Sequence, residues 1–210
     1  MKALFFDLDG TMWNAIDRMK DAYNAAMKKN SLKYRFTYEK VKSYMGLTPE
    51  ETSILAFPDL EVEEGLRLFK IMYLEELEYL KKTPGILYPH VEKTLSTLKN
   101  DYPLYVVSNA DKGYIETFFE GTGLGKYFKA HLAAGDTGLS KWENIKLLQE
   151  REKIDEVIYI GDTLKDKIEA TKAGAKFIHA AYGFGQIDNY EYRIDSFDEL
   201  PKLVNVLFSR

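Results

Sequence analysis

Short apolar runs that end in polar residues alternate along this chain with segments of helical spacing. The three clearest runs are residues 4–6, 104–107 and 157–160. Each run is too short for a helix, and the turn residues that flank it favour a buried strand. Between the runs, apolar residues recur every three or four positions, which is typical of amphipathic helices. This alternation predicts an α/β fold, with a parallel sheet covered by helices on both faces.

A long stretch after the first run carries helical spacing throughout and has no convincing strand pattern. It extends from Ala15 to about Lys82. Within it, Thr48-Pro49-Glu50-Glu51 has the residues of a helix start, and we expect a long helix to follow. The apolar face of that helix is formed by Leu66, Phe69, Tyr73, Leu77 and Leu80. The predicted domains are therefore an all-helical insert at 15–81 and an α/β core at 1–14 and 82–210.

Composition narrows the class of protein. The chain has 210 residues, of which 45% are hydrophobic and 30% are charged, and this suits a globular protein with a sizeable core. The net charge of -4 and the lack of a basic stripe argue against a nucleic-acid partner. No apolar run approaches the roughly 18 residues that span a bilayer, so no membrane partner is expected. Without cysteine and without a signal-peptide pattern, a cytoplasmic location is expected.

Polar residues follow each of the three clearest strands. Asp7 and Asp9 come after the first strand, Ser108 and Asn109 after the second, and Asp162 after the third. Because parallel strands place their carboxyl ends at one edge of the sheet, these side chains are expected to meet there. The carboxylates of Asp7 and Asp9 would repel each other unless a bound Mg²⁺ or a lysine lay between them.

Two further residues can complete this edge of the sheet. Lys141 begins a helix that opens with a capping box, and the N-terminus of that helix can reach the same edge. Asp166 lies four residues after Asp162, so one turn of helix places the two carboxylates on the same face. Taken singly, Ser108 fits an ordinary turn and Lys141 fits an exposed lysine. Taken together and in this order, the polar residues after the three strands, with Lys141 and Asp166, favour a functional site at this edge of the sheet.

Four short motifs in the chain resemble those of the haloacid dehalogenase-like hydrolase superfamily. They are Asp7-Leu8-Asp9-Gly10-Thr11, then Ser108 after a hydrophobic strand, then Lys141, then Gly161-Asp162-Thr163-Leu164-Lys165-Asp166. The helical insert resembles the C1 cap domain of that family, and Tyr182-Gly183-Phe184-Gly185 is similar to its phosphoglycolate-phosphatase-like branch. The resemblance covers essentially the whole chain and implies a Rossmann-like core.

The resemblance implies a mechanism that the chemistry of these residues supports. Asp7 would attack phosphorus and carry the phosphoryl group as an aspartyl phosphate. Asp9 would protonate the leaving alcohol and then activate water, and Lys141 would neutralise the nucleophile and the phosphate. Mg²⁺ is the implied cofactor, held by the Asp7 side chain, the Asp9 carbonyl and Asp162. Asp166 would complete the metal shell or orient Lys141.

The substrate-binding residues implied by the resemblance lie in both predicted domains. They are Thr11, Ser108, Asn109 and Gly46, of which Ser108 would donate a hydrogen bond to the phosphate. Gly46 belongs to a segment, Met45-Gly46-Leu47-Thr48, that resembles the specificity loop of the cap. Arg18 and Arg35 are candidates for gripping a substrate carboxylate, although an exposed position is the favoured interpretation of each. The tyrosines of the insert are expected to serve in packing; they include Tyr23, Tyr38, Tyr44 and Tyr73.

These inferences predict a Mg²⁺-dependent phosphatase that acts on a small phosphorylated metabolite, as a monomer or homodimer. The cap is expected to open and close on linkers near Trp13-Asn14 and Lys82-Thr83. A β-phosphoglucomutase-like phosphotransferase shares the four motifs and is the alternative; the fate of the aspartyl phosphate distinguishes the two. A non-catalytic binding protein on the same fold is disfavoured, because every catalytic position is filled. The presence of Asp9 argues against a dehalogenase or a phosphonatase. The sequence leaves the physiological ester open.

Overall fold

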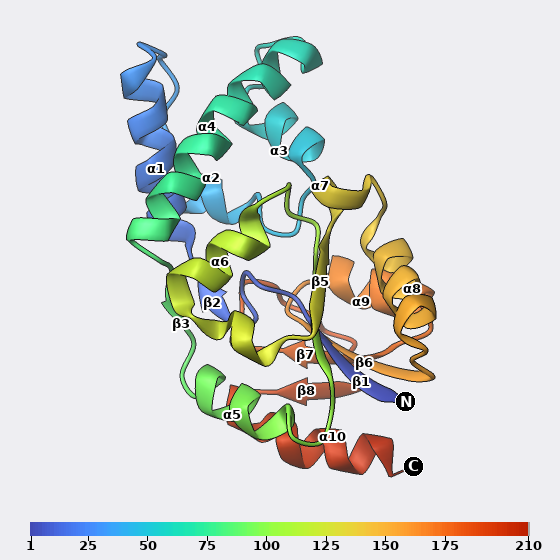
Figure 1. Cartoon of the computed structure of the whole chain (residues 1–210). Helices are drawn as coiled ribbons and strands as arrows, with labels where there is room; N and C mark the ends of the chain where they lie inside the picture. Colours follow the sequence, from blue (N-terminus) through green and yellow to red (C-terminus); the bar gives the residue numbers. More distant parts are fainter. Residues whose placement is uncertain (210) are drawn as a thin grey trace.

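The computed structural model describes residues 1–209, and its centre is a parallel sheet of six strands (Figure 1). The strand order is β5-β4-β1-β6-β7-β8, so the N-terminal strand lies inside the sheet. The strands are β1 (Lys2–Phe6), β4 (Leu104–Ser108), β5 (Ala130–Ala133), β6 (Glu156–Gly161), β7 (Lys176–Ala180) and β8 (Tyr192–Ile194). Phe5 of β1 lies opposite Tyr105 of β4 and Tyr159 of β6. Open α/β sheets bind ligands where the strand order reverses in this way.

Side chains alternate along β1 and contribute to two separate cores. Leu4 and Phe6 share one core with α5 (Val91–Leu98), α6 (Tyr114–Thr122) and α10 (Leu200–Phe208). Ala3 and Phe5 share the other core with α8 (Lys141–Glu152) and α9 (Leu164–Lys172). The short elements are η1 (Leu124–Tyr127), α7 (Ala134–Thr137) and η2 (Phe197–Glu199). The predicted α/β fold, with helices on both faces of a parallel sheet, is confirmed.

Four helices that follow β1 in the chain form a separate group above the sheet in Figure 1. They are α1 (Ile16–Lys29), α2 (Tyr38–Lys42), α3 (Pro49–Ala56) and α4 (Val62–Lys82). We refer to α1 to α4 as the helical insert. Its ends agree with the helical stretch expected from Ala15 to about Lys82.

The long helix expected after Thr48 is instead two helices. The predicted capping box is present, since the Thr48 N–H donates to Glu51 Oε2 at 2.7 Å, and it opens α3. However, α3 ends at Ala56, and Phe57 has φ -131° and ψ 60°. The reason is Pro58, which lacks an N–H and disfavours a helical conformation in the residue before it. The apolar face that we predicted belongs to α4 alone.

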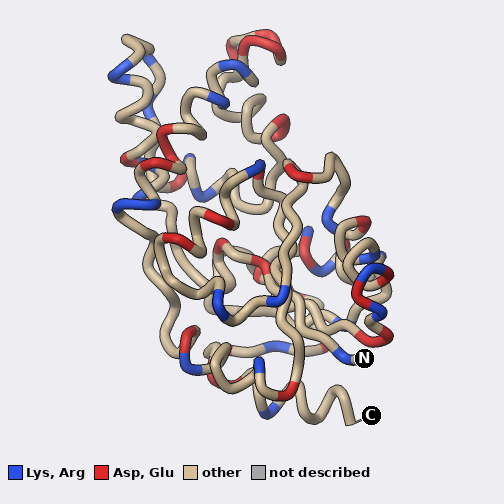
Figure 2. The backbone as a smooth tube through the Cα atoms, in the orientation of Figure 1, with Lys and Arg blue, Asp and Glu red and all other residues tan. Residues whose placement is uncertain are grey.

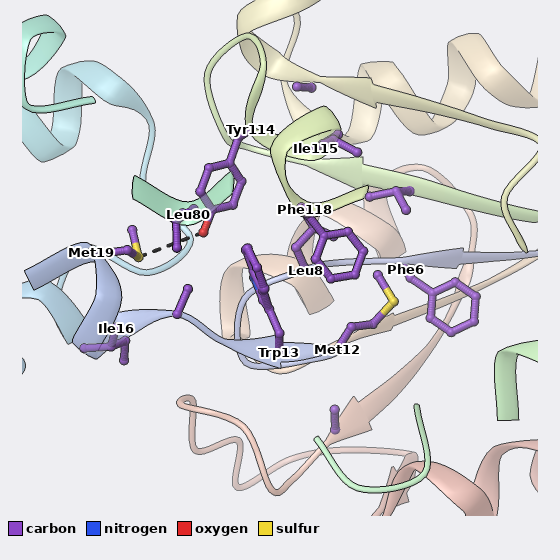
Figure 3. Packing of buried hydrophobic residues seen from close by; sticks show 14 of the residues in the cluster. Phe6, Leu8, Met12, Trp13, Ile16, Met19, Leu80, Tyr114, Ile115 and Phe118 are labelled. Atoms are coloured by element: carbon purple, nitrogen blue, oxygen red, sulfur yellow. Dashed lines mark hydrogen bonds between the residues drawn. The ribbon is translucent and has the colours of Figure 1, made fainter. Parts of the chain in front are cut away.

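Two short strands that the pattern did not predict connect the insert to the sheet. β2 (Trp13–Asn14) precedes α1, β3 (Ile86–Leu87) follows α4, and the two pair antiparallel. Trp13 is fully buried, and its ring centroid lies 4.9 Å from that of Phe118 in an edge-on contact (Figure 3). A Cβ on Gly85 would come within 2.8 Å of the Trp13 ring. Trp13 therefore anchors the first half of the connection in the core, whereas Ile86 of β3 is exposed.

Charged residues are spread over the outer elements. Figure 2 shows Lys and Arg interspersed with Asp and Glu along the helices. Among residues 1–209, none of the helices is both long enough and apolar enough to cross a membrane. The candidate site lies at the carboxyl ends of β1, β4 and β6, where the turns after the strands and the N-termini of α8 and α9 meet.

Candidate active site

The first motif forms a tight turn at the carboxyl end of β1. Asp7 continues the strand pairing, because its N–H donates to the Ile160 carbonyl at 2.9 Å. Gly10 has a φ of +77°, and a Cβ at this position would lie 2.1 Å from Asp162 Oδ2. Glycine is required here both by the backbone conformation and by the close approach of Asp162. The turn thereby brings the first and fourth motifs into contact.

A buried lysine joins carboxylates from two different elements. Lys141 is the first residue of α8, whose start is fixed by a capping box in which the Ser140 N–H donates to Glu143 Oε2 at 2.9 Å. The Lys141 side chain is 1% exposed, and its Nζ donates to Asp7 Oδ1 at 2.9 Å and to Asp166 Oδ1 at 2.5 Å. Burial acts to lower the pKa of Lys141, but the Asp166 and Asp7 carboxylates outweigh it and raise the pKa well above its usual value. Lys141 is therefore a fixed cation.

Three buried carboxyl groups from β1, β6 and α9 converge beside this lysine. Oxygen atoms of Asp7, Asp162 and Asp166 lie within 4.8 Å of one another. Burial raises the pKa of Asp7 to about 6 against the opposing effect of Lys141, and burial and the Asp166 charge raise the pKa of Asp162 well above its usual value. One lysine does not balance this much negative charge, so the cluster favours a further cation.

The oxygen atoms of Asp162 fit such a cation. Its Oδ2 accepts hydrogen bonds from the Phe184 N–H at 2.7 Å and the Gly185 N–H at 3.2 Å. Its Oδ1 is buried and has no hydrogen-bond partner among the described residues. A buried carboxylate oxygen without a partner is unfavourable unless a donor or a cation meets it. A set of ligands made only of oxygen suits a hard ion such as Mg²⁺.

Asp166 differs from Asp162 because both of its oxygens are occupied. Oδ1 accepts from Lys141, and Oδ2 accepts from the Thr163 N–H at 3.0 Å and the Thr163 hydroxyl at 2.7 Å. The capping box of α9 therefore fixes the carboxyl group that holds Lys141. Of the two roles expected for Asp166, these contacts favour the orientation of Lys141.

The second aspartate of the first motif is held by an aromatic side chain. Tyr114 of α6 donates its hydroxyl to Asp9 Oδ1 at 2.9 Å. The same hydroxyl points toward the sulfur of Met19 in α1 (Figure 3). Burial, followed by the Asp7 charge, raises the pKa of Asp9 to about 7. A carboxyl group with a pKa near neutrality suits general acid and base chemistry. Sequence reasoning missed Tyr114, because its neighbours Ile115 and Phe118 mark only a buried helix face.

The predicted substrate-binding residues do not all reach one cavity. Ser108 and Asn109 at the end of β4 line the cavity above the strand ends, as does Gly46 of the insert. Asn109 Nδ2 donates to the Gly46 carbonyl at 3.0 Å, so the core and the insert touch here. Ser108 Oγ accepts from the Ala110 N–H at 3.2 Å, which leaves the hydroxyl hydrogen available to a ligand. Thr11 is fully buried and lies outside the cavity lining.

The cavity between the strand ends and the insert is small, with a volume of about 70 Å³. Asp7, Asp9 and Lys141 form part of its floor. Six residues of its lining come from the insert and carry aromatic or polar groups: Tyr23, Tyr44, Thr52, Phe69, Tyr73 and Glu76. Three of the tyrosines that we expected to serve in packing thus face the cavity. Neither Arg18 nor Arg35 belongs to its lining.

Glu76 of α4 is an acidic residue that sequence reasoning missed. It is 1% exposed, it lines the cavity, and its Oε2 accepts a 2.8 Å hydrogen bond from the Tyr23 hydroxyl. Its Oε1 is buried without a hydrogen-bond partner among residues 1–209. Burial raises the pKa of Glu76 to about 8, and the Asp9 charge adds to the effect. A signal was present, because Glu76 falls on the same helical face as Phe69, Tyr73 and Leu80.

A family model described as haloacid dehalogenase-like hydrolase matches residues 4–180. The chain belongs to the haloacid dehalogenase-like hydrolase family. The match includes all four motifs that meet at the strand ends, and it includes the helical insert. The expected superfamily and the hydrolase class are thereby confirmed.

This haloacid dehalogenase-like hydrolase is similar over nearly its whole length to a curated phosphatase and to two solved structures. A curated phosphoglycolate phosphatase of Vibrio parahaemolyticus is 26% identical over 228 residues, which cover 98% of this chain and 97% of that protein. A predicted phosphoglycolate phosphatase from Haemophilus somnus has a TM-score of 0.80 at 22% identity, over 97% of this chain and 98% of that chain. CbbY from Rhodobacter sphaeroides, in complex with phosphate, has a TM-score of 0.78 at 17% identity, over 94% of this chain and 95% of that chain.

The two solved structures establish the fold of this hydrolase. The curated relatives support the expected enzyme class, a phosphatase of the phosphoglycolate-phosphatase-like branch.

Proposed function

We propose that this hydrolase cleaves a small phosphate monoester with Mg²⁺ as cofactor, through an aspartyl phosphate on Asp7. The position of the Asp7 carboxyl group carries the proposal. It lines the cavity at the end of β1, and its Oδ1 accepts a 2.9 Å hydrogen bond from Lys141. A carboxylate attacks an anionic phosphate only where positive charge stands beside both groups, and Lys141 is a fixed cation at that point.

The reaction divides into two steps, and Asp9 serves in both. In the first step, an Asp7 oxygen bonds to phosphorus, the bond from phosphorus to the alcohol oxygen breaks, and Asp9 gives its proton to that oxygen. In the second step, Asp9 takes a proton from water, the water oxygen bonds to phosphorus, and inorganic phosphate leaves Asp7. A pKa of about 7 suits a group that is protonated in one step and unprotonated in the next.

The acidic cluster is where Mg²⁺ fits this chain. The unpaired Asp162 Oδ1 and the Asp7 carboxylate would hold the ion together with the Asp9 backbone carbonyl. Bound Mg²⁺ would supply positive charge against the phosphate oxygens. Asp166 supports the same site by holding Lys141 in place.

The helical insert acts in this proposal as a cap at residues 15–81 over a catalytic core at 1–14 and 82–210. Its contacts with the core include Asn109 with the Gly46 carbonyl at 3.0 Å, the Tyr73 hydroxyl with the Asp111 carbonyl at 2.8 Å, and Lys165 with Glu51 at 2.7 Å. Opening of the cap would break these contacts and admit substrate, and closure would exclude water. A cytoplasmic monomer or homodimer remains the prediction.

Release of inorganic phosphate from p-nitrophenyl phosphate, in Mg²⁺ or in EDTA, tests the proposal. We expect release that depends on metal, and a loss of at least about a thousandfold in Asp7→Asn. Matching thermal unfolding curves for the two proteins control for misfolding. Undiminished release by Asp7→Asn would remove Asp7 as the nucleophile. Transfer of ³²P to a second hydroxyl of a sugar phosphate, with little free phosphate, would instead favour the phosphotransferase.

A further inference from the structure

Among the described residues, the cap side of the cavity carries an acidic side chain, Glu76, and no lysine, arginine or histidine. We propose that it selects phosphate monoesters whose organic part ends in a hydrogen-bond donor without negative charge, a hydroxyl or an ammonium group, and that it rejects a terminal carboxylate. This inference rests on the proposed phosphatase function and names its substrate class. This preference would exclude phosphoglycolate, the substrate in the names of the curated relatives, because phosphoglycolate ends in a carboxylate.

The first support is the buried pair of Glu76 and Tyr23. The Tyr23 hydroxyl donates a hydrogen bond to Glu76 Oε2, and this bond fixes the carboxyl group. Glu76 Oε1 has no hydrogen-bond partner among the described residues. Both residues line the cavity, and Glu76 is 1% exposed. A buried acceptor oxygen without a partner is unfavourable, and a donor on the substrate would satisfy it. The position next to the catalytic carboxyl groups makes the substrate the natural source of that donor.

The second support is the distribution of cations. Of the described residues that line the cavity, Lys141 alone is a lysine or arginine, and its ammonium group already binds Asp7 and Asp166. Arg35 is exposed and donates to the Tyr34 carbonyl. A substrate carboxylate therefore finds no free cation on the cap side. Recognition of a carboxylate ordinarily relies on such a cation, most often an arginine in a two-pronged contact.

The third support is the aromatic lining around Glu76. Tyr44 is buried, and its hydroxyl has no hydrogen-bond partner among the described residues, so it is available to a substrate hydroxyl. Phe69 and Tyr73 stack with their ring centroids 5.7 Å apart. Aromatic ring faces attract ammonium groups, whereas their negative potential repels a carboxylate. Above the Glu76 pKa of about 8, a substrate carboxylate placed here would also face the ionised Glu76 side chain, which is only 1% exposed.

Four esters of similar size test the proposal in the Mg²⁺-loaded protein at pH 9, where Glu76 is ionised because its pKa is about 8. They are 2-aminoethyl phosphate, 2-hydroxyethyl phosphate, n-propyl phosphate and phosphoglycolate. We expect kcat/KM for an ester with a terminal donor to exceed that for phosphoglycolate by at least about tenfold, with n-propyl phosphate between them. The ratio of the aminoethyl to the hydroxyethyl ester tells which donor is preferred. A kcat/KM for phosphoglycolate equal to or above the other three would overturn the proposal.

Variants of one helix assign the preference to Glu76. At pH 9 Glu76 is ionised, because its pKa is about 8. Glu76→Gln then removes the negative charge and keeps the shape, so the preference over phosphoglycolate should shrink toward one. Glu78→Gln is the matched control, because Glu78 lies two residues along α4 with a side chain that is 65% exposed. It should keep the wild-type ratio. An unchanged ratio in Glu76→Gln contradicts the assignment. Tyr23→Phe leaves the acid in place without its fixing bond, and it should give an intermediate ratio.

Binding of unreactive phosphonates separates this inference from the proposed function. In 3-aminopropylphosphonate and 3-phosphonopropionate a methylene replaces the ester oxygen, and calorimetry on the Mg²⁺-loaded wild type needs no turnover. We expect the amine to bind at least about tenfold more tightly than the carboxylate. Tighter binding of the amine without hydrolysis of any ester would contradict the proposed phosphatase and support the selectivity of the cavity. Hydrolysis together with tighter binding of the carboxylate would support the phosphatase and contradict the selectivity.

Discussion

The Tyr114 hydroxyl donates a 2.9 Å hydrogen bond to Asp9 Oδ1, and so joins a helix of the core to the turn after β1. Tyr114 is buried, and its ring lies edge-on to Trp13 with the centroids 6.0 Å apart. The hydroxyl is therefore held in place by packing on the ring. Since one carboxylate oxygen is fixed in this way, Asp9 is kept in a single orientation toward the cavity. Tyr114 is a positioning residue for the proposed acid and base.

Tyr114→Phe should lower kcat for alkyl phosphates by about tenfold and change KM little, because the acid loses its orientation and the phosphate contacts remain. The defect should be smaller for p-nitrophenyl phosphate, whose leaving group needs little protonation. Steady-state kinetics on both esters measure the difference. Tyr127→Phe removes an exposed hydroxyl that donates to Glu92, and it should behave as wild type. Equal losses on the two esters would indicate a structural defect and not a misplaced acid.

Lys141→Ala should both destabilise the protein and reduce phosphate turnover. The change leaves the buried Asp7 and Asp166 carboxylates without their shared cation, which costs about 3 kcal/mol or more in the free energy of unfolding. Urea unfolding in EDTA measures this loss. Lys165→Ala breaks the exposed ion pair with Glu51 and should cost less than about 1 kcal/mol. Similar losses in the two variants would contradict the central place of Lys141.

Mg²⁺ should stabilise the wild type through the carboxylate cluster. A ligand that binds only the folded state raises the free energy of unfolding by about 2.7 kcal/mol at a hundred times its dissociation constant. Asp162→Asn replaces the unpaired oxygen and should weaken the effect, seen as a smaller rise in Tm across a Mg²⁺ titration. Asp136→Asn, at an exposed position outside the cluster, should keep the full rise. A metal effect that survives intact in Asp162→Asn would place the ion elsewhere.

Glu76 should make the metal-free protein less stable as the pH rises. The folded chain keeps the Glu76 proton up to about pH 8, whereas the ordinary pKa of a glutamate side chain is 4.5. Between these values the folded state holds up to one proton more than the unfolded state. The free energy of unfolding therefore falls by up to about 1.4 kcal/mol per pH unit, with the full contribution below the lower value and its loss complete above the upper one.

Glu76→Gln should remove that part of the slope. Urea unfolding from pH 5 to 8.5 in EDTA measures the slope for both proteins, and Glu78→Gln provides the control. Parallel curves for Glu76→Gln and the wild type would show that Glu76 is ionised in the folded chain already near its ordinary pKa.

The residues of the proposed active site were predictable because their positions follow from two simple rules. Strand-length apolar runs locate the strands, and parallel strands bring their carboxyl ends to one edge. Asp7, Ser108 and Asp162 each follow such a run, and the capping box places Lys141 at a helix N-terminus. The structure brings all four together, with Thr11 as the predicted binding residue that lies outside the cavity lining.

Several structural features could not be predicted from the spacing of apolar and polar residues. β8 spans Tyr192–Ile194, and the paired strands β2 and β3 have two residues each, which is too short for a period to emerge. Pro58 was a local signal that outweighed the helical spacing on either side of it. The cavity lining is harder still, because an apolar helix face looks the same in sequence whether it covers a core or a ligand. Glu76 on such a face was the one residue that told them apart.

The paired strands β2 and β3 have an evolutionary consequence. Because Trp13 lies opposite Leu87, the chain leaves and re-enters the sheet domain at the same place. The helical insert between these two residues is therefore a single insertion with adjacent ends. The register of β1 with β4 and β6 involves no residue of the insert. A gene could exchange the whole segment and keep the reacting groups untouched. If the proposed function holds, the segment that would set selectivity and the strand ends that would carry the chemistry can change independently, and a new substrate does not require a new reaction.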